Sequence, residues 1–477
     1  MSGSSSVEDG PFVWFPALVL CLFMVLCLCL GPFSLFNAGL ARRLVPYRHA
    51  TLTPSTSSLP DGPDNPSSNL NMVAGLVTPH ELTKVKSSSD RIEEDLAEAR
   101  AMIREAIRTR NYTSDRDEVF VPRGRVYRNP YAFHQSHIEM IKRFKIWTYR
   151  EGERPLVHNG PMKDIYGIEG QFIGEIESPG CPFSAPTPDE AHAFFIPVSI
   201  TNIVQYIYEP YMMSNKSKII HTFSDYVKVV ADKHPYWRGS NGADHFMVSC
   251  HDWAPLVSEA DPNMFGNFIR VLCNANKTEG FDPRRDVPLP EFKVPPRTID
   301  VVDTGRPLDE RNILAFFAGG AHGYIRKLVL NQWKDRDDDV QVHEYLPPGG
   351  EGYMQLMGRA RFCLCPSGYE VASPRIVEAI GVGCIPVIIS DGYALPFEDV
   401  LDWAKFSVRI HVGRIRDIKT ILQAIPREKY LRLQKGVMAV KRHFTLNRPA
   451  KPYDMFHMVL HSIWLRRLNV GLGGLQV

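Results

Sequence analysis

The chain has 477 residues, enough for two or more domains with sizeable cores. Its 55 Lys and Arg residues nearly balance its 53 Asp and Glu residues, which gives a formal net charge of +2 at pH 7. This balance, with no basic arm or aromatic-basic stripe in the sequence, argues against a nucleic-acid partner.

The first element along the chain is an apolar segment without any charge between Pro11 and Ala41. Its core, Val13 to Leu30, is long enough to cross a bilayer as one helix. A cleaved signal peptide is the main alternative, but the segment is too long and the preceding tail has no basic residue. We therefore expect a cytosolic tail at residues 1–10 and a transmembrane signal anchor at residues 11–36.

The orientation of this anchor is predicted differently by two signals. Acidic residues precede the span and arginines follow it, so the positive-inside rule places the carboxyl side in the cytosol. Acceptor sequons for N-glycosylation favour a lumenal body instead, and we side with them. The sequons begin at Asn111, Asn215 and Asn276.

Nine cysteines are present, and three of them lie in the apolar span. The other six are an even number, compatible with lumenal disulfides whose pairing the sequence does not give. Cys384 begins an apolar strand, and we expect it to be a small core residue. No Cys-x-x-Cys or His-x-x-x-His spacing suggests zinc.

Residues 37–117 are predicted to form a stem. Residues 51–72 are rich in Ser, Thr, Pro, Asp and Asn, a composition that does not bury a core. Residues 91–110 follow with apolar side chains at helical spacing. This amphipathic helix could be a self-association seam, but packing against the globular body is the favoured interpretation.

The globular part is predicted to be α/β. In residues 118–300, strands are expected at 144–149, 193–197 and 245–249, and the Pro-rich, charged segment 281–307 is interpreted as a crossing between domains. In residues 301–440, strands at 313–318, 340–342, 362–365, 384–389 and 406–410 recur at intervals that suit helices. This alternation favours a parallel sheet. Residues 441–477 are expected to be helices that pack back on the first domain.

The strand at 362–365 is followed by a polar loop and then by a helix, with Ser373 as its expected N-cap and Pro374 at its first position. A helix start beyond the carboxyl end of a parallel strand suits a phosphate, and Ser367 lies in the same loop. Glu370 and Glu378 flank this position. Carboxylates suit sugar or ribose hydroxyls rather than phosphate, so the segment predicts a nucleotide-sugar site.

A glycine-rich turn follows the strand at 313–318. Gly319 and Gly320 would let the backbone approach a diphosphate, and Arg326 and Lys327 would offset charge on a leaving UDP. An ordinary βα turn is the alternative. Arg375 is expected to bind phosphate or to pair with a nearby glutamate.

The acidic run 335–339 contains Asp-x-Asp, a pattern that can bind a metal ion at the end of an apolar strand. It precedes an apolar strand instead of ending one, so we interpret it as a solvated turn and expect no metal.

Several of these segments resemble a known family. Glu370 and Glu378 have the Glu-x7-Glu spacing of many glycosyltransferases of the GT-B type, and residues 362–398 resemble the exostosin-type domain of plant glycosyltransferase family 47. The likeness extends over roughly residues 118–470. It also includes the runs 145–149, 242–246, 250–253, 316–326 and 461–468.

The resemblance implies a GT-B-like fold, with two Rossmann-like domains that face a cleft. It also implies inverting transfer from a UDP-sugar donor to a hydroxyl of a cell-wall polysaccharide or glycan, without another cofactor. A single-pass type II protein of the Golgi membrane is expected, with a lumenal catalytic part that can form complexes with itself or other glycosyltransferases. A catalytically inactive, membrane-anchored scaffold is the alternative; a glycoside hydrolase is less favoured because it needs no nucleotide site.

An inverting transfer needs a base for the acceptor hydroxyl, expected from the first domain. The densest titratable clusters there are 244–245 and 251–252. We nominate Asp252 first, with Asp244 and His245 as the other candidates, although such residues often serve only to cap turns.

Overall fold

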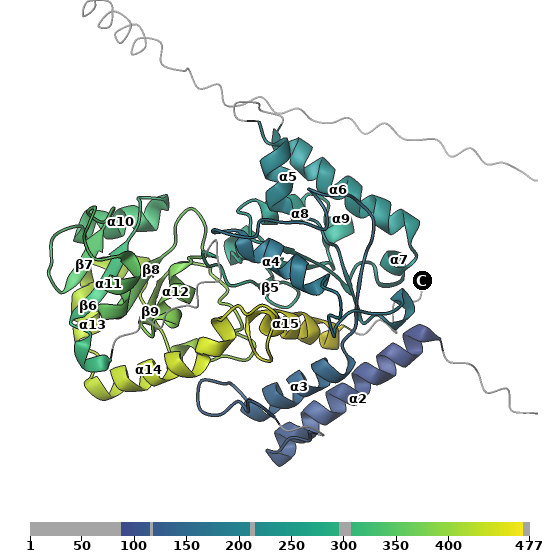
Figure 1. Cartoon of the computed structure of the whole chain (residues 1–477), viewed down its shortest axis with the longest axis horizontal. Coiled ribbons are helices and arrows are strands. Elements are labelled where there is room, and N and C mark those ends of the chain that lie inside the picture. Colours follow the sequence, from purple (N-terminus) through teal and green to yellow (C-terminus); the bar gives the residue numbers. More distant parts are fainter. Residues whose placement is uncertain (1–86, 115–117, 210–214, 295–306, 471–477) are drawn as a thin grey trace, which may run out of the picture. The chain divides into compact units, whose positions relative to one another are not determined.

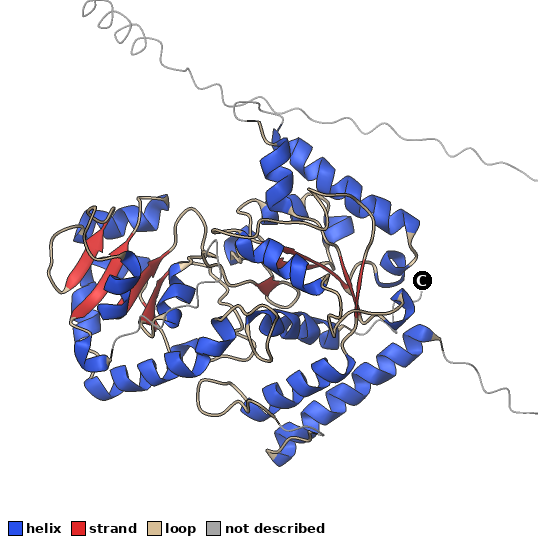
Figure 2. Cartoon of the chain, viewed as in Figure 1, coloured by secondary structure: helices blue, strands red, loops and turns tan. Residues whose placement is uncertain are grey.

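Two five-stranded parallel sheets organise the part of the chain that the computed structural model describes, residues 87–114, 118–209, 215–294 and 307–470 (Figures 1 and 2). The expected membrane anchor and most of the stem lie outside this part. Among the described residues, no helix has the length and apolar character needed to cross a membrane. Two parallel sheets fit the expected GT-B-like fold.

The first sheet has the strand order β1-β2-β3-β4-β5. Its strands pair in parallel, and every residue of β2 to β5 is buried, as expected for a sheet covered on both faces. Because the strands follow each other in chain order, this sheet lacks the reversal of a doubly wound Rossmann domain. The strands are β1 Ile146–Thr148, β2 Ala193–Phe195, β3 His245–Ser249, β4 Ile269–Leu272 and β5 Val287–Pro288.

Strands β4 and β5 were not expected. Strand β4 carries Arg270 in its centre, and β5 has two residues, one of them a proline. Strand β5 falls inside the segment 281–307 that we interpreted as a crossing, so that interpretation is wrong for its first part. Residues 295–306 lie outside the described part, and the boundary at 300 stays a prediction.

Helices connect the strands of the first sheet, and they vary in length from four to nineteen residues. They are α3 Pro130–Arg143, α4 Gly167–Ile176, α5 Ile200–Ile207, α6 Asn215–Lys233, α7 Tyr236–Ser240, α8 Ala254–Glu259 and α9 Pro262–Phe265.

The second sheet has the order β10-β9-β8-β6-β7, again with all strands parallel. The chain direction across the sheet reverses between β6 and β8, and in such sheets a ligand crevice lies beyond the carboxyl ends of these two strands. The strands are β6 Ile313–Ala318, β7 Val340–His343, β8 Ala360–Pro366, β9 Ile385–Ile389 and β10 Val408–Arg409. The helices are α10 Gly323–Trp333, α11 Tyr353–Arg359, α12 Arg375–Gly381, α13 Ile418–Gln423 and α14 Arg427–Val440.

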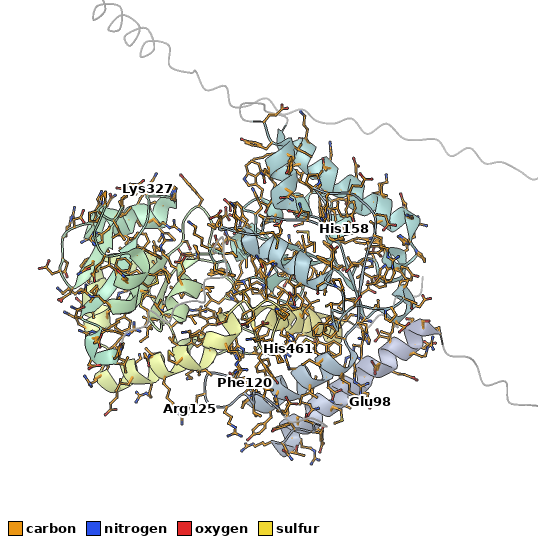
Figure 3. The ribbon with its side chains drawn as sticks, viewed as in Figure 1. Glu98, Phe120, Arg125, His158, Lys327 and His461 are labelled. Carbon is orange, nitrogen blue, oxygen red and sulfur yellow. A yellow bond between two sulfur atoms is a disulfide. The ribbon has the colours of Figure 1, made fainter. Side chains whose placement is uncertain are left out.

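Helix α2, Ser88–Thr109, covers the predicted amphipathic segment and packs against α3. Leu96 and Ala99 are fully buried in this contact. Arg143 of α3 pairs with Glu98, which Figure 3 labels, at 3.1 Å. The apolar face of α2 therefore packs against the globular body of the same chain, as the favoured interpretation predicted.

Helix α15, Met455–Asn469, packs against α3 and β5 of the first part (Figure 1). Almost all of its side chains are buried. Around it lies a group of five buried imidazoles that we call the histidine cluster. Three of them contact the Tyr453 ring, and the other two contact His137. The cluster consists of His134, His137, His443, His457 and His461, of which Figure 3 labels His461.

Two disulfides join neighbouring strands. Cys250 and Cys273 link the ends of β3 and β4, and Cys363 of β8 bonds to Cys384, just before β9. The expectation that Cys384 is an unbonded core residue is therefore wrong. This pairing could not be predicted from the sequence, because it depends on β8 and β9 being neighbours in the sheet.

Candidate active site

The site is built where the carboxyl edges of the two sheets approach each other. Segments after β4 and β9 form an antiparallel backbone bridge, with Lys277 N donating to Gly392 O and Ala394 N donating to Ala275 O, each at 3.0 Å. The segments that follow β3, β5, β6 and β8, including the first turns of α10 and α12, carry the ionisable groups described below. Groups from the two sheets interact electrostatically, because the pKa of Glu291 beyond β5 responds to the charges of Arg326 and Arg375.

Two arginines, the buried Arg326 and the partly buried Arg375, form the cationic side of the site. Arg375, at the start of α12, donates to Ala318 O from Nε at 3.2 Å and Nη2 at 2.8 Å. Arg326 of α10 donates to Pro366 O at 3.3 Å. Neither guanidinium forms an ion pair with a carboxylate of the described residues. Burial, together with the charge of Arg375, lowers the pKa of Arg326 to about 10. Among the described residues the two guanidiniums bond to carbonyl oxygens, and Arg375 also lies over the Phe317 ring, so both are available to an anionic ligand.

The predicted glycine turn makes room for Arg375 and for the loop after β8. A Cβ on Gly319 would lie 2.1 Å from Arg375 Nη2, and one on Gly320 would lie 3.0 Å from His322 Nε2. Gly323 has φ of +77°, and a Cβ there would lie 2.0 Å from Gly368 O of the β8–α12 loop. The turn thus lets the two loops meet, a role beyond the expected approach of a diphosphate.

Glu378 lies on α12 and accepts a hydrogen bond from the Tyr353 hydroxyl of α11 at 2.7 Å. Burial raises the pKa of Glu378, while the Tyr353 hydrogen bond and the Arg375 charge act against that rise. The predicted helix start needs correction, because α12 begins at Arg375. The Ser373 hydroxyl makes no capping hydrogen bond; it is buried without a partner among the described residues.

Carboxylates from both sheets face these groups. We call Asp252, Glu291 and Glu370 the carboxylate cluster. Burial raises the pKa of Glu370 to about 8, and the charges of Asp252, Glu279 and Glu291 contribute. The sequence therefore identified two of the three members.

Asp252 follows β3 and accepts a hydrogen bond from the Tyr166 hydroxyl at 2.8 Å. The loop that carries it is held from below by Glu169, a buried carboxylate that accepts hydrogen bonds from Ser249 Oγ at 2.7 Å and Cys250 N at 2.9 Å. The Cys250–Cys273 disulfide ties the same loop to β4. Asp252 is thus held in a fixed position at the carboxyl edge of the first sheet.

Glu291 is the residue that sequence reasoning missed. It lies just beyond β5, it is only 8% exposed, and its Oε2 has no hydrogen-bond partner among the described residues. Burial and the Asp252 charge raise its pKa to about 8, partly opposed by Arg326 and Arg375. Its only signal in the sequence is its place after a strand too short to recognise.

Ser367 closes the β8–α12 loop, because its hydroxyl bonds to Val371 O at 2.9 Å and Ser390 Oγ at 2.6 Å. A pocket of about 550 Å³ opens beside this loop. Its lining includes Glu370, Lys327, which Figure 3 labels on α10, and the largely exposed ring of Tyr369.

Asp244 and His245 lie at the opposite, amino end of β3. Asp244 accepts hydrogen bonds from Ser240 and from His245 Nδ1, and His245 Nε2 lies 2.7 Å from the Tyr149 hydroxyl. His245 is fully buried and stacks on Phe194. The structure does not bring this pair to Asp252, and its side-chain contacts with Ser240, Tyr149 and Phe194 lie within the first part of the fold.

The acidic run 335–339 lies in the turn between α10 and β7. Lys419 contacts Asp337 at 2.7 Å and Asp339 at 2.9 Å, and His343 contacts Asp335 at 3.0 Å. These contacts agree with the interpretation of the run as a turn.

The three sequons differ in their surroundings. Asn111 is exposed, whereas the side chain of Asn215 lies outside the described ones. Asn276 is 8% exposed, and its Oδ1 accepts hydrogen bonds from Thr278 N at 3.1 Å and Thr278 Oγ1 at 2.8 Å. Asn276 also lies in the backbone bridge to Tyr393, and glycosylation of the three asparagines stays a prediction.

Comparisons with known proteins agree with this arrangement. Residues 125–425 match the Exostosin GT47 domain. The probable glycosyltransferases At3g07620 and At5g03795 of Arabidopsis thaliana are 48% and 49% identical over 387 residues, which cover 80% and 81% of this chain and 82% and 74% of theirs. The probable beta-1,4-xylosyltransferase IRX10L of Arabidopsis thaliana is 30% identical over 347 residues, 68% of this chain and 81% of its own. The chain therefore belongs to the exostosin GT47 family and is a glycosyltransferase.

Proposed function

We propose that this enzyme moves a sugar from a UDP-sugar to a hydroxyl of a cell-wall polysaccharide or glycan, with inversion at the anomeric carbon. The observation that carries this proposal is the pair of arginines, Arg326 and Arg375, which form no ion pair with a carboxylate of the described residues and lie near carboxylates of the first sheet. A cation pair on one side and a carboxylate on the other are what transfer from a diphosphate donor requires.

The donor would lie along the carboxyl edge of the second sheet. Its diphosphate would contact the two guanidiniums, and Glu378, oriented by Tyr353, would accept a hydrogen bond from a sugar or ribose hydroxyl. The same guanidiniums would stabilise the negative charge that develops on the leaving UDP. We therefore propose that transfer proceeds without a metal ion.

The acceptor would approach from the first sheet. Its hydroxyl oxygen bonds to the anomeric carbon, the bond from that carbon to UDP breaks, and the hydroxyl proton passes to a carboxylate of the first sheet. The names of the relatives, which include a probable xylosyltransferase and a probable glucuronosyltransferase, support a glycan acceptor. We further propose that the apolar segment at residues 11–36 anchors the enzyme in the Golgi membrane with the body in the lumen.

The test is UDP release by the full-length chain in detergent, offered a panel of UDP-sugars with mixed cell-wall oligosaccharides. We expect release with one donor, reduced roughly tenfold to a hundredfold by Glu378→Ala, because a hydrogen bond to a charged group is lost. Glu428→Ala, at an exposed position of α14, is the matched control and should keep full activity. Folded protein that releases no UDP with any donor and acceptor would contradict the proposal and favour the scaffold alternative.

A further inference from the structure

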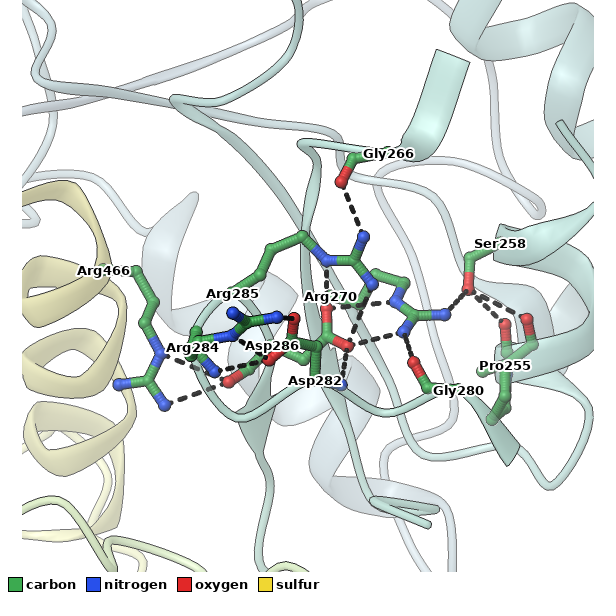
Figure 4. A network of polar contacts seen from close by, with 11 residues as sticks. Pro255, Ser258, Gly266, Arg270, Gly280, Asp282, Arg284, Arg285, Asp286 and Arg466 are labelled. Atoms are coloured by element: carbon green, nitrogen blue, oxygen red, sulfur yellow. Dashed lines mark hydrogen bonds and ion pairs between the residues drawn. The ribbon is translucent and has the colours of Figure 1, made fainter. Parts of the chain in front are cut away.

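The backbone around Glu291 is fixed on both sides. Before it, Leu289 N donates to Leu272 O at 2.8 Å, and after it Val294 and Asp164 exchange two backbone hydrogen bonds. Asp286, at the start of this segment, is held by the buried Arg270 of β4, and its carbonyl oxygen accepts from Arg466 of α15 (Figure 4). The short segment that carries Glu291 is therefore rigid, which suits a residue whose carboxylate must be placed accurately.

Glu291 is unusual among the buried acids. Glu169 accepts hydrogen bonds from Ser199, Thr201 and Ser249, and Asp286 pairs with Arg270. Within the described chain, Glu291 Oε2 is the one carboxylate oxygen that is buried without a hydrogen-bond partner. Such an atom is costly unless a ligand satisfies it, and an acceptor hydroxyl is a donor of the right kind.

The groups that face Glu291 come from both sheets. Asp252 lies on the β3–α8 loop, Arg326 on α10, Arg375 and Glu378 on α12, and the Tyr393 ring and Glu370 also interact with its charge. Glu291 thus lies beyond β5 of the first sheet, on the acceptor side, and its carboxylate interacts electrostatically with the two arginines of the proposed diphosphate site. Because its pKa is raised to about 8, its ionised form is a stronger base than an ordinary carboxylate.

We propose that Glu291 is the catalytic base that takes the proton of the acceptor hydroxyl, and that Asp252, held by Tyr166, is a positioning residue. This inference rests on the proposed function. As the acceptor oxygen bonds to the anomeric carbon, its proton moves to the Glu291 carboxylate, and UDP leaves with the electron pair of the broken bond. The Tyr166 hydroxyl already donates to Asp252 Oδ1, whereas Glu291 Oε2 is buried without a hydrogen-bond partner among the described residues and can accept the incoming hydroxyl.

The test compares Glu291→Gln and Asp252→Asn in the full-length chain, with UDP release and calorimetric UDP binding measured on each. We expect Glu291→Gln to lower kcat by roughly a hundredfold to ten-thousandfold while its Kd for UDP changes less than threefold. Asp252→Asn should lower kcat less. Wild-type kcat/KM should rise with pH and level off above about pH 8, whereas the residual activity of Glu291→Gln should lack this rise.

Glu291→Asp keeps a carboxylate at the position and should recover part of the activity, which a merely structural role would not require. The inference is overturned if Glu291→Gln keeps more than about a tenth of wild-type kcat, or if Asp252→Asn is the variant that removes the pH-dependent rise. Failure of the wild-type chain to bind UDP would instead overturn the proposed function itself, so the two failures are distinguishable.

Discussion

The histidine cluster predicts a specific response to acid. Burial lowers the pKa of His443 and His457 to about 4 and that of His461 to about 3, whereas an unfolded chain has histidines near pKa 6.5. Below pH 6.5 the unfolded state therefore binds more protons at these positions than the folded state. Stability from these residues is present above that pH and is lost as the pH falls.

The size of the effect follows from these values. Between pH 7 and pH 5.5 each unfolded histidine gains about 1.2 kcal/mol from protonation, while the three folded imidazoles stay neutral. Glu291 and Glu370, whose pKa values are raised to about 8, act in the opposite direction over the same range. The wild-type stability alone thus mixes two opposing contributions, and a variant is needed to separate them.

His461→Gln is the informative change, because glutamine does not titrate and can still hydrogen-bond to Ser136, which lies 2.9 Å from His461 Nε2. We expect the stability of this variant to fall by about 1.2 kcal/mol less than that of the wild type between pH 7 and pH 5.5. Urea unfolding at the two pH values measures the difference. The exposed His221→Gln serves as control and should follow the wild type. Parallel behaviour of His461→Gln and wild type would refute the reasoning.

Two further predictions concern the site. Tyr353→Phe removes the hydrogen bond to Glu378 and should raise the donor KM roughly threefold to tenfold, measured as UDP release at varied donor concentration; an unchanged KM would contradict the role given to Glu378. The double variant Cys250→Ser/Cys273→Ser opens a link between residues 23 positions apart, and should lower the unfolding free energy by roughly 3 kcal/mol in urea titrations. It should also lower kcat, because the loop of Asp252 loses its tie to β4, and full activity would contradict that placement.

Much of the fold was predictable because its signals are local. Strands β3 and β6 have the predicted bounds, His245–Ser249 and Ile313–Ala318, since each is a fully buried run between turn signals. Strand β5 was not predicted, because its two residues, one of them a proline, are too few to show the alternation of apolar and polar side chains that indicates a strand. The neighbours of such a strand, not its own sequence, place it in the sheet.

The candidate site shows the same division. Arg326, Glu370, Arg375 and Glu378 were predicted from loops that follow recognisable strands, and the structure brings them to one edge. Glu291 was missed because its burial and the lack of a hydrogen-bond partner for Oε2 are properties of the folded chain, and no local pattern in the sequence signals them. Pairing of Cys363 with Cys384 likewise depends on strand adjacency.

The central claim is that Arg326 and Arg375 form the diphosphate site of a UDP-sugar donor. The most direct measurement is calorimetric binding of UDP and of uridine to the full-length chain, with Arg326→Met/Arg375→Met beside a Lys429→Met control at an exposed position of α14. We predict that UDP binds the wild type at least about tenfold more tightly than uridine, and that the double variant loses this advantage while the control keeps most of it. Equal binding of UDP and uridine by the wild type, or an undiminished preference for UDP in the double variant, would contradict the account.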